Sequence, residues 1–335
     1  MVENRVTIAD VAIIAGVSTQ TVSRVINNKS EISATTRQRV LEVIEQMGYR
    51  PNRVARSLVT QQTFTIGLVI PDISNPFFSE LTRGTEDVAW ENGYNVLLCN
   101  TVEKEEREKA SLRLLEETRV DGVILCSSRM DQAELFPMLE SFRSVVLVNR
   151  PAPRSVAGVV RIDDFEGGFS AASHLLRTGR THLAFLAGPL KSFSGCERLR
   201  GGMEAMKAQG VSICPDKLRF CPPKRQSGYD SAIELLNLYP DIDGLICYND
   251  LVAVGALQAC AELGRDVPND VAIIGFDDIV LSRVVCPTLS TLSISKVQMG
   301  AIAARMLLDR IQGRVDQDEV VMKANLILRG STPSI

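Results

Sequence analysis

Residues Thr7–Asn28, TIADVAIIAGVSTQTVSRVINN, decide the fold of the N-terminal part of this 335-residue chain. Thr7 and Asp10 have the spacing of a capping box, in which a hydroxyl and a carboxylate satisfy free backbone amides in the first turn of a helix. Gly16 suits the left-handed residue that ends a helix, and Ser18 can cap a second one. The pattern therefore predicts two short helices joined by a tight turn.

A third helix follows, because Ser33 can cap it and Gly48 can end it after Met47. The second helix is predicted over residues 19–27. Small Ala12 in the first helix and the glycine in the turn suit two helices that cross at close range, which is the helix-turn-helix arrangement. A small helical bundle with an ordinary polar face is the alternative.

The exposed face of the second helix is polar and can reach base edges in a major groove. TIADVAIIAGVSTQTVSRVINN, followed by SATTRQRVLEVIEQMGYRPNRVARSL, closely resembles the head of the lactose-repressor and galactose-repressor family, and the likeness continues through essentially the whole chain. The resemblance implies that the second helix contacts double-stranded operator DNA. The DNA-binding residues expected in the head are Thr7, Ser18, Thr19, Gln20, Thr21, Ser23, Arg24 and Asn27.

The stretch RPNRVARSL, residues 50–58, is too short to be a stable helix alone in water. In the family that it resembles, this segment forms a hinge helix only on DNA, pairs with its twin across the dimer axis and inserts a leucine into the minor groove. The corresponding DNA-binding residues here are Asn52, Arg53, Ala55, Arg56 and Leu58. A plain solvated linker is the alternative.

From residue 64 onward, short apolar runs alternate with amphipathic stretches of helix length. The predicted strands are 65–70, 95–98, 122–126, 145–148, 159–162, 183–187, 244–247 and 271–275. The predicted helices include 77–92, 104–118, 165–177, 251–263 and 296–312. Continuous apolar strands that alternate with helices indicate parallel sheets covered on both faces, and a chain of this length favours two such sheets.

The predicted architecture is a small all-α helix-turn-helix head on an α/β body with two doubly wound parallel-sheet lobes. We expect the head at 1–50, the hinge at 51–62, and an effector-binding and dimerisation domain at 63–335. Within that domain, the first lobe is expected at about 63–161 plus 291–322, and the second at about 162–290 plus 323–335.

Polar and aromatic residues follow several of the predicted strands, where ligands bind in open parallel sheets. Amides, carboxylates, guanidinium groups and a phenylalanine pair suit a neutral polyol with one apolar face. The effector-binding residues expected are Asn75, Phe77, Phe78, Arg150, Arg198, Asn249 and Asp277. Each group taken alone is more often a helix cap or part of a solvated loop.

The body also resembles the periplasmic sugar-binding protein fold, whose two lobes with three crossovers close on a ligand. The resemblance implies a ribose-like or other monosaccharide as the effector. Two positions depart from the family pattern, because Asn149 stands where an aspartate is common and Ile294 or Ser295 where a glutamine is common. In purine-type relatives an aromatic residue precedes SGY, whereas CPPKRQSGY has none, which argues against a purine corepressor.

Charge is distributed unevenly, with eight basic and five acidic side chains in residues 1–60 and a net charge of −6 in the remainder. This asymmetry suggests a polyanionic partner for the head only. The eight cysteines form no C-x-x-C pair and are expected to be reduced thiols, and no metal site or cofactor is expected.

No apolar run is long enough to span a membrane, and no basic segment precedes the early apolar patch, so we expect a cytoplasmic protein. The family resemblance implies a homodimer. Common catalytic motifs are absent from the sequence, and the expectation is a regulator, not an enzyme. A purine-, phosphosugar- or protein-corepressed regulator of the same family is the alternative. A glycosidase would leave the basic helix-turn-helix unexplained, and a periplasmic transport receptor, which would suit the body, is not expected because the sequence shows no signal peptide.

Overall fold

The computed structural model describes residues 6–26, 32–49, 62–211, 214–314 and 317–333, and the chain forms two compact units, Met1–Thr63 and Phe64–Ile335. We describe each unit by itself. The expected contacts at Asn27 and in the hinge, at Asn52, Arg53, Ala55, Arg56 and Leu58, lie outside the described residues.

The head consists of α1 (Ile8–Ala15), α2 (Thr19–Ile26) and α3 (Ala34–Met47). The predicted capping box is present, since the Thr7 backbone N–H donates to Asp10 Oδ2 at 2.8 Å and Thr7 Oγ1 accepts from the Asp10 backbone. Gly16 ends α1 with φ 63°. Ser18 Oγ accepts from the Thr21 backbone at 3.1 Å. The local signals in the sequence therefore predicted the start and end of α1 and α3 and the start of α2, whereas the predicted end of α2 at residue 27 lies outside the described residues.

A small valine-rich core holds the three helices together. It buries one side of each helix, and its members are Val11, Ala12, Ala15, Val22, Val25, Val40 and Val43. Burial of the hydrophobic residues of α2 leaves its polar residues on the opposite, outer side.

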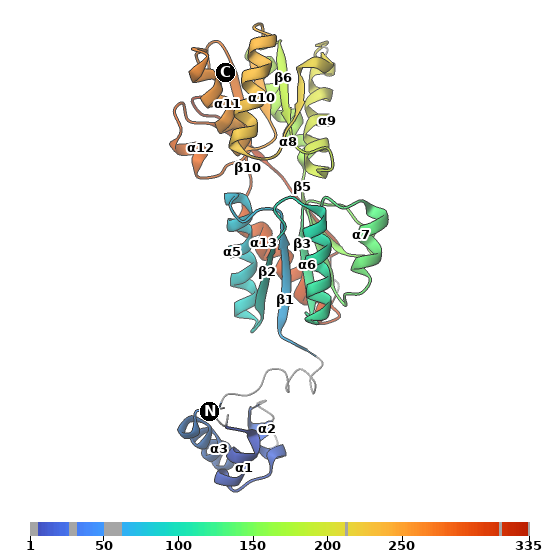
Figure 1. Cartoon of the computed structure of the whole chain (residues 1–335), viewed down its shortest axis with the longest axis vertical. Coiled ribbons are helices and arrows are strands. Elements are labelled where there is room, and N and C mark those ends of the chain that lie inside the picture. The colour runs from blue at the N-terminus through green and yellow to red at the C-terminus, as the bar shows by residue number, and fades with distance from the viewer. Residues whose placement is uncertain (1–5, 27–31, 50–61, 212–213, 315–316, 334–335) are drawn as a thin grey trace. The chain divides into compact units, whose positions relative to one another are not determined.

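The first lobe of the body is built on a parallel sheet of six strands in the order β11-β5-β4-β3-β1-β2 among the described residues. Its strands are β1 (Thr65–Ile70), β2 (Asn95–Asn100), β3 (Gly122–Cys126), β4 (Val145–Val148), β5 (Gly158–Ile162) and β11 (Glu319–Met322). Its helices are α5 (Pro76–Glu91), α6 (Glu105–Glu117), α7 (Gln132–Leu139) and α13 (Lys296–Ile311), which surround the sheet in Figure 1.

The second lobe repeats this plan with the strand order β12-β10-β9-β8-β6-β7, in which β12 alone is antiparallel to its neighbour. Its strands are β6 (Leu183–Ala187), β7 (Leu218–Phe220), β8 (Gly244–Cys247), β9 (Ala272–Asp277), β10 (Ser290–Ser293) and β12 (Asn325–Ile327). Its helices are α8 (Asp164–Arg177), α9 (Phe193–Ala208), α10 (Arg225–Leu238), α11 (Asp250–Glu262) and the short α12 (Leu281–Val284). A 3-10 turn at Pro215–Lys217 precedes β7.

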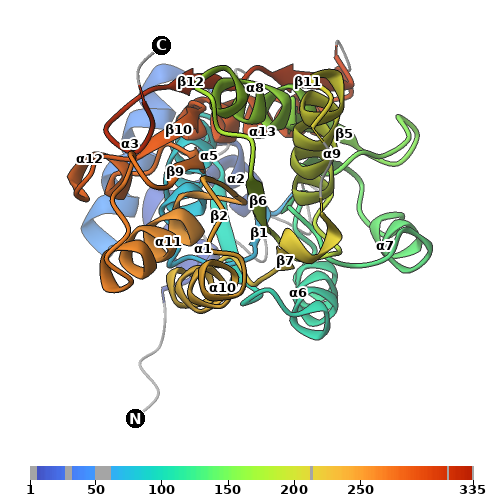
Figure 2. The ribbon, with the colours of Figure 1, turned by 90° about the horizontal axis from the view of Figure 1, so that it is seen from above.

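The chain passes between the lobes three times, after β5, after β10 and between β11 and β12. The two sheets expected from the alternating pattern are therefore present. The sequence placed the second passage at residue 291, whereas β10 still belongs to the second sheet and α13 begins at Lys296. Figure 2 shows the second lobe from above.

Three helix pairs cross so closely that each contact contains a glycine from both helices. A Cβ atom on Gly84 of α5 would lie 1.9 Å from the Val297 carbonyl oxygen of α13, and one on Gly300 would lie 2.0 Å from the Leu81 oxygen. Matching pairs join α8 to α9, through Gly168 and Gly201, and α10 to α11, through Gly228 and Gly255. Any larger side chain at these positions would push the helices apart.

No helix in the described part of the chain is long and apolar enough to cross a membrane.

Candidate functional site

A cleft between the two lobes contains most of the expected effector-binding residues. From the first lobe it is lined by Asn75, Phe77, Phe78, Glu103, Ser127, Arg129 and Asn149. From the second lobe it is lined by Ser194, Arg198, Pro223, Tyr248, Asn249 and Asp277. The remaining cavity is about 20 Å³, which is room for about one water molecule. A sugar could therefore enter only if the lobes or the lining side chains moved apart.

Three lining residues stand at the ends of strands with a left-handed backbone. Ser127 follows β3 with φ 49°, Asn149 follows β4 with φ 55°, and Asp277 ends β9 with φ 108°. Residues other than glycine adopt such angles at an energetic cost, and strained backbone of this kind clusters at functional sites. The turn at each strand end brings a polar side chain into the cleft.

Two asparagines each cap a helix and line the cleft. The Asn75 side chain accepts a hydrogen bond from the Phe77 backbone at 3.0 Å, at the start of α5. The Asn249 side chain does the same with the Val252 backbone at 3.0 Å, at the start of α11. Because the cap uses the amide oxygen, the Nδ2 group of each asparagine remains as a donor for a ligand.

Arg198 on α9 is the most highly connected side chain of the cleft. Its Nε donates to Asp164 Oδ1 at 2.7 Å, and its Nη1 donates to the Tyr248 carbonyl oxygen at 2.7 Å. The guanidinium lies 3.5 Å from the centre of the Phe276 ring. Burial would lower the pKa of Arg198, but the carboxylates of Asp164 and Asp277 raise it, so the guanidinium stays charged.

Asp277 provides a carboxyl group that is nearly fully buried. Burial raises its pKa to about 7, although the positive charges of Arg198 and Lys296 act in the opposite direction. Its Oδ1 lies 3.8 Å from Arg198 Nη2. A carboxyl group that titrates near neutral pH beside an arginine can accept or donate hydrogen bonds to a hydroxyl group.

Two buried polar atoms of the lining have unused hydrogen-bonding capacity. Among the described residues, Asn149 Oδ1 and Ser194 Oγ have no hydrogen-bond partner. Buried polar groups in folded proteins are nearly always paired, and exceptions call for an explanation. A ligand rich in hydroxyl groups could bond to both atoms.

Arg150 is the one expected effector-binding residue that does not line the cleft. Its Nη1 donates to the Ser128 carbonyl oxygen at 3.0 Å, and the side chain is buried behind the loop that follows β3. The preceding residue, Asn149, points into the cleft instead. The sequence pattern pointed to both Asn149 and Arg150, and we expected Arg150 to contact the effector. In the structure Arg150 instead bonds to the loop behind the lining.

Seven lining residues were not among those expected: Glu103, Ser127, Arg129, Asn149, Ser194, Pro223 and Tyr248. Ser127 and Tyr248 directly follow strands, so the rule that led to Asn249 could have found them. Glu103, Arg129, Ser194 and Pro223 lie further from a strand end, and the sequence carries no comparable signal for them.

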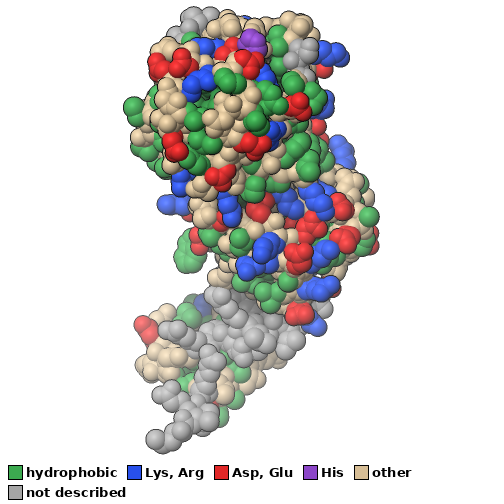
Figure 3. Space-filling view, turned by 45° about the horizontal axis from the view of Figure 1, so that its top comes forward, with side chains coloured by type: hydrophobic (Ala, Val, Ile, Leu, Met, Phe, Trp, Pro, Cys, Tyr) green, Lys and Arg blue, Asp and Glu red, His purple; other side chains and the backbone are tan. Residues whose placement is uncertain are grey.

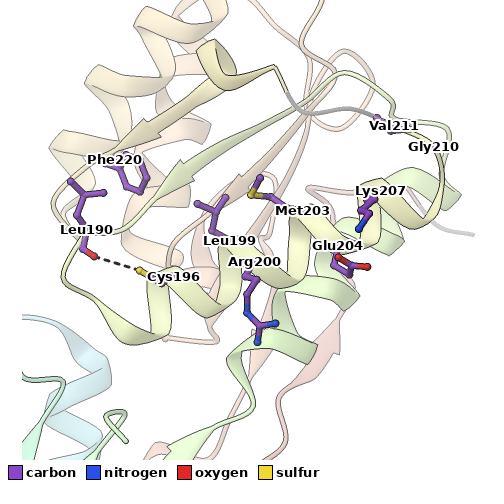
Figure 4. A pocket seen from close by; sticks show the side chains of 10 residues that line it. All are labelled: Leu190, Cys196, Leu199, Arg200, Met203, Glu204, Lys207, Gly210, Val211 and Phe220. Carbon is purple, nitrogen blue, oxygen red and sulfur yellow. Dashed lines mark hydrogen bonds between the residues drawn. The ribbon is translucent and has the colours of Figure 1, made fainter.

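A larger hollow lies elsewhere, on the outer side of α9 beside the edge strand β7. It has a volume of about 730 Å³ and is lined mainly by aliphatic and aromatic side chains such as Leu190, Met203 and Phe220. Figure 4 shows Arg200 pointing away from Leu190 and Phe220, and its guanidinium is paired with Glu197 at 2.6 Å. Because few polar groups converge there, the interlobe cleft is the better candidate for a ligand site.

In the head, the residues expected to contact DNA lie on the outer side of α2 and at helix starts. Ser18, Thr19, Gln20 and Arg24 are exposed, whereas Thr21 and Ser23 are partly buried. The Thr21 hydroxyl lies 2.9 Å from the Ser18 hydroxyl. Thr7 is exposed and belongs to the capping box of α1.

The surface of the body does not share the positive balance of the head. On the face shown in Figure 3, basic and acidic side chains of the body are intermingled. A mixed surface of this kind gives little attraction to a polyanion, which leaves the head as the candidate DNA-binding part.

Comparison with known proteins points to one family. Residues 7–52 match the bacterial regulatory proteins of the lacI family, and residues 172–332 match a periplasmic binding protein-like domain. The HTH-type transcriptional regulator RegA of Clostridium saccharobutylicum is 38% identical over 327 residues, which cover 97% of this chain and 98% of RegA. The HTH-type transcriptional repressor PurR of Haemophilus influenzae is 35% identical over 98% of this chain and 99% of PurR.

Solved structures agree with this assignment. The Lac repressor dimer bound to operator and the anti-inducer ONPF matches with a TM-score of 0.89 and 27% identity over 99% of this chain and 100% of that chain. A complex of the transcriptional regulator CelR with cellobiose matches with a TM-score of 0.75 and 32% identity over 98% of this chain and 100% of that chain. Regulators of this family bind operator DNA and small-molecule effectors. The protein is therefore a member of the lacI family of bacterial regulatory proteins, a DNA-binding transcriptional regulator.

Proposed function

We propose that the protein is a repressor that binds a pseudo-palindromic operator as a homodimer, and that a small neutral sugar, a ribose-like or other monosaccharide, controls its operator affinity. The observation that carries the effector class is the composition of the cleft, where Arg198, Asn249 and Asp277 line the same cavity as two phenylalanine rings. Hydroxyl groups pair with charged and amide groups, while the C–H face of a sugar packs on rings. The CelR relative was solved with cellobiose, which supports a carbohydrate.

In the proposed mechanism, the sugar stabilises a closed arrangement of the lobes. If closure changes the spacing of the two heads in a dimer, sugar affinity and operator affinity are coupled reciprocally. Residues 51–62 are proposed to form the hinge, with Leu58 as a minor-groove wedge on DNA. The Lac repressor dimer bound to operator supports the dimeric arrangement.

Operator binding is tested by selection of sequences from a pool of random duplexes with the full-length protein. We expect enrichment of one two-fold symmetric site, with specific binding at least about 10³-fold tighter than binding to random DNA and a steep loss of affinity with salt. Gln20→Ala on α2 should relax the selected sequence. Gln38→Ala, an exposed glutamine of α3, serves as the matched control. Absence of any sequence preference at physiological salt would refute the proposal.

A purine effector is the second candidate, because PurR of Haemophilus influenzae is similar over the whole chain. The loop before α10 contributes Pro223 to the cleft and no aromatic ring that could stack on a base. Titration of ribose, galactose and hypoxanthine into the complex of protein and operator distinguishes the two classes. A response to hypoxanthine alone would favour the purine class.

A further inference from the structure

The first lobe contributes an ion pair to the cleft that is shielded from water. Arg129 Nε lies 2.8 Å from Glu103 Oε2, and the two side chains are 8% and 16% exposed. Both residues line the cavity. A guanidinium and a carboxylate side by side place hydrogen-bond donors next to acceptors, at a separation that matches two neighbouring hydroxyl groups of a ligand. Hydrogen bonds to these charged groups are stronger in such a shielded site than in water.

Both members of this pair are held in place before any ligand arrives. The Arg129 backbone N–H donates to Glu108 Oε2 at 3.1 Å, and the Ser128 hydroxyl donates to the other oxygen of the same carboxylate. Arg150 holds the Ser128 carbonyl oxygen from behind. The Glu103 backbone N–H donates to the Pro71 carbonyl oxygen at 3.1 Å. A binding group whose supporting contacts are complete loses little entropy when it meets a ligand.

The second lobe presents a comparable pair from the opposite side of the cleft. Arg198 is bonded to Asp164 and approaches Asp277, as described above. Tyr248 of the second lobe lines the same cavity as Arg129, and it contributes, with Glu103, to raising the pKa of that guanidinium.

Charge balance in the cleft argues for an uncharged ligand. Each arginine of the lining already has a carboxylate partner, so a phosphate or carboxylate on the ligand would meet Glu103 or Asp277 at close range and be repelled. A pair of adjacent hydroxyl groups faces no such repulsion, because one accepts from the guanidinium and the other donates to the carboxylate.

We propose that Arg129 and Glu103 together are specificity-determining residues, which select an effector that carries two adjacent hydroxyl groups on the side bound by the first lobe. This inference rests on the sugar-binding function proposed above and narrows it. A site built to bond a hydroxyl group rejects analogues that lack the group, because its own buried polar atoms are then left unpaired.

The test uses the full-length protein and isothermal titration calorimetry. The probes are ribose, galactose, glucose and cellobiose as neutral sugars, glucuronate and glucose 6-phosphate as anionic ones, and hypoxanthine. The neutral sugar that binds is then compared with its deoxy analogues. Arg129→Gln and Glu103→Gln are the test variants, and Arg113→Gln, an exposed arginine on α6 of the same lobe, is the matched control.

We expect a neutral sugar to bind the wild type and the control equally, and each test variant to bind it at least about tenfold more weakly. Removal of one hydroxyl group should weaken binding to the wild type by a similar factor but have little further effect in Arg129→Gln. Arg129→Lys keeps the charge but not the fork of donors and should also weaken binding. If Arg129→Gln does not fold, the sugar affinity of Arg129→Lys takes its place in the comparison with the wild type.

Equal affinity in the control and in the Arg129 variants would overturn the inference and leave the sugar-binding function intact. Preference for an anionic sugar over its neutral parent would also overturn it. Failure of every neutral sugar to bind the wild type would refute both the inference and the proposed effector class, while the operator selection would still report on DNA binding.

Discussion

Asp277 has both a left-handed backbone, with φ 108°, and a carboxyl group whose pKa burial raises to about 7. Its ordinary pKa of 3.8 applies in the unfolded chain. Because the folded protein binds the proton more tightly, Asp277 stabilises the fold most fully below about pH 4. That contribution is lost as the pH rises towards 7 and stays absent above it.

We predict that Asp277→Asn removes this dependence. The free energy of unfolding of the wild type, relative to the variant, should fall by at most about 1.4 kcal/mol per pH unit between roughly pH 4 and pH 7 and then level off. Urea unfolding at several pH values measures this difference, with Asp230→Asn, an exposed carboxylate of the same lobe, as the control. A difference between wild type and Asp277→Asn that does not change with pH would contradict the raised pKa.

The expected residues that line the cleft follow a strand either directly or after a loop. Asn249 and Asp277 were found in this way, because the carboxyl ends of parallel strands face the cleft. Arg150 was chosen in place of Asn149, since the sequence does not show which of two consecutive side chains turns towards the ligand. Arg129 lies three residues beyond β3, and its position depends on the buried Glu108, a contact between distant parts of the chain.

At the scale of secondary-structure elements, the glycine contact between α8 and α9 positions Arg198. A Cβ atom on Gly168 would lie 2.0 Å from the Arg198 carbonyl oxygen. The backbone of Arg198 on α9 therefore packs directly against Gly168 of α8, where there is no room for a side chain. The same contact places Gly201 of α9 against the Phe165 oxygen of α8.

We predict that Gly168→Ala separates α8 from α9 and shifts Arg198 away from Asp164 and Asp277. Overpacking of this kind costs about 1–3 kcal/mol of stability, and effector binding should weaken as well. Ser170→Ala, two residues along the same helix, is the control, since it leaves the crossing unchanged. Thermal unfolding and sugar titration measure the two effects, and an unchanged sugar affinity in a folded Gly168→Ala protein would be evidence against this positioning role.

The elements that the sequence predicted best are the buried central strands. The predicted bounds agree with the structure for β1, β3, β4, β6 and β8. An apolar run between polar turns leaves little choice about where a strand begins and ends. The edge strands β7, β11 and β12 were not predicted, since they are short and partly exposed and have no continuous apolar run. Among the helices that were not predicted, α9 buries mainly glycines and polar residues, which weakens its hydrophobic periodicity, and α10 buries only Gly228, Ala232, Leu235 and Leu236.

For the whole molecule, the alternation of strands and helices predicted two lobes, and the structure contains two sheets. Which strands belong to which sheet does not follow from the pattern, because β10 and α13 are separated by only two residues yet belong to different lobes. Resemblance to a known fold supplied the three passages between the lobes. Packing of α13 on α5, more than 200 residues away, is a tertiary contact that local patterning cannot reveal.

The glycine contact between α5 and α13 also has a consequence for the order in which the body acquires its structure during synthesis. The first lobe begins to emerge from the ribosome first, but α13 and β11 complete it only near the end of the chain. The second lobe lacks only the edge strand β12 once β10 has been made. Because domains fold as units when their chain is available, the second lobe should fold before the first.

We predict that a chain ending at Ser295 contains a protease-resistant second lobe and a first lobe that is readily digested. In this shortened chain α13 is missing, so the surface of α5 around Gly84 has no helix to pack against. Limited proteolysis followed by mass spectrometry would identify the protected segment, with the full-length protein as the control. Equal protection of both lobes in the shortened chain would rule out this order. If the second lobe folds first, the half of the cleft that contains Arg198 and Asp277 forms early during synthesis. The half that contains Arg129 and Glu103 is completed last.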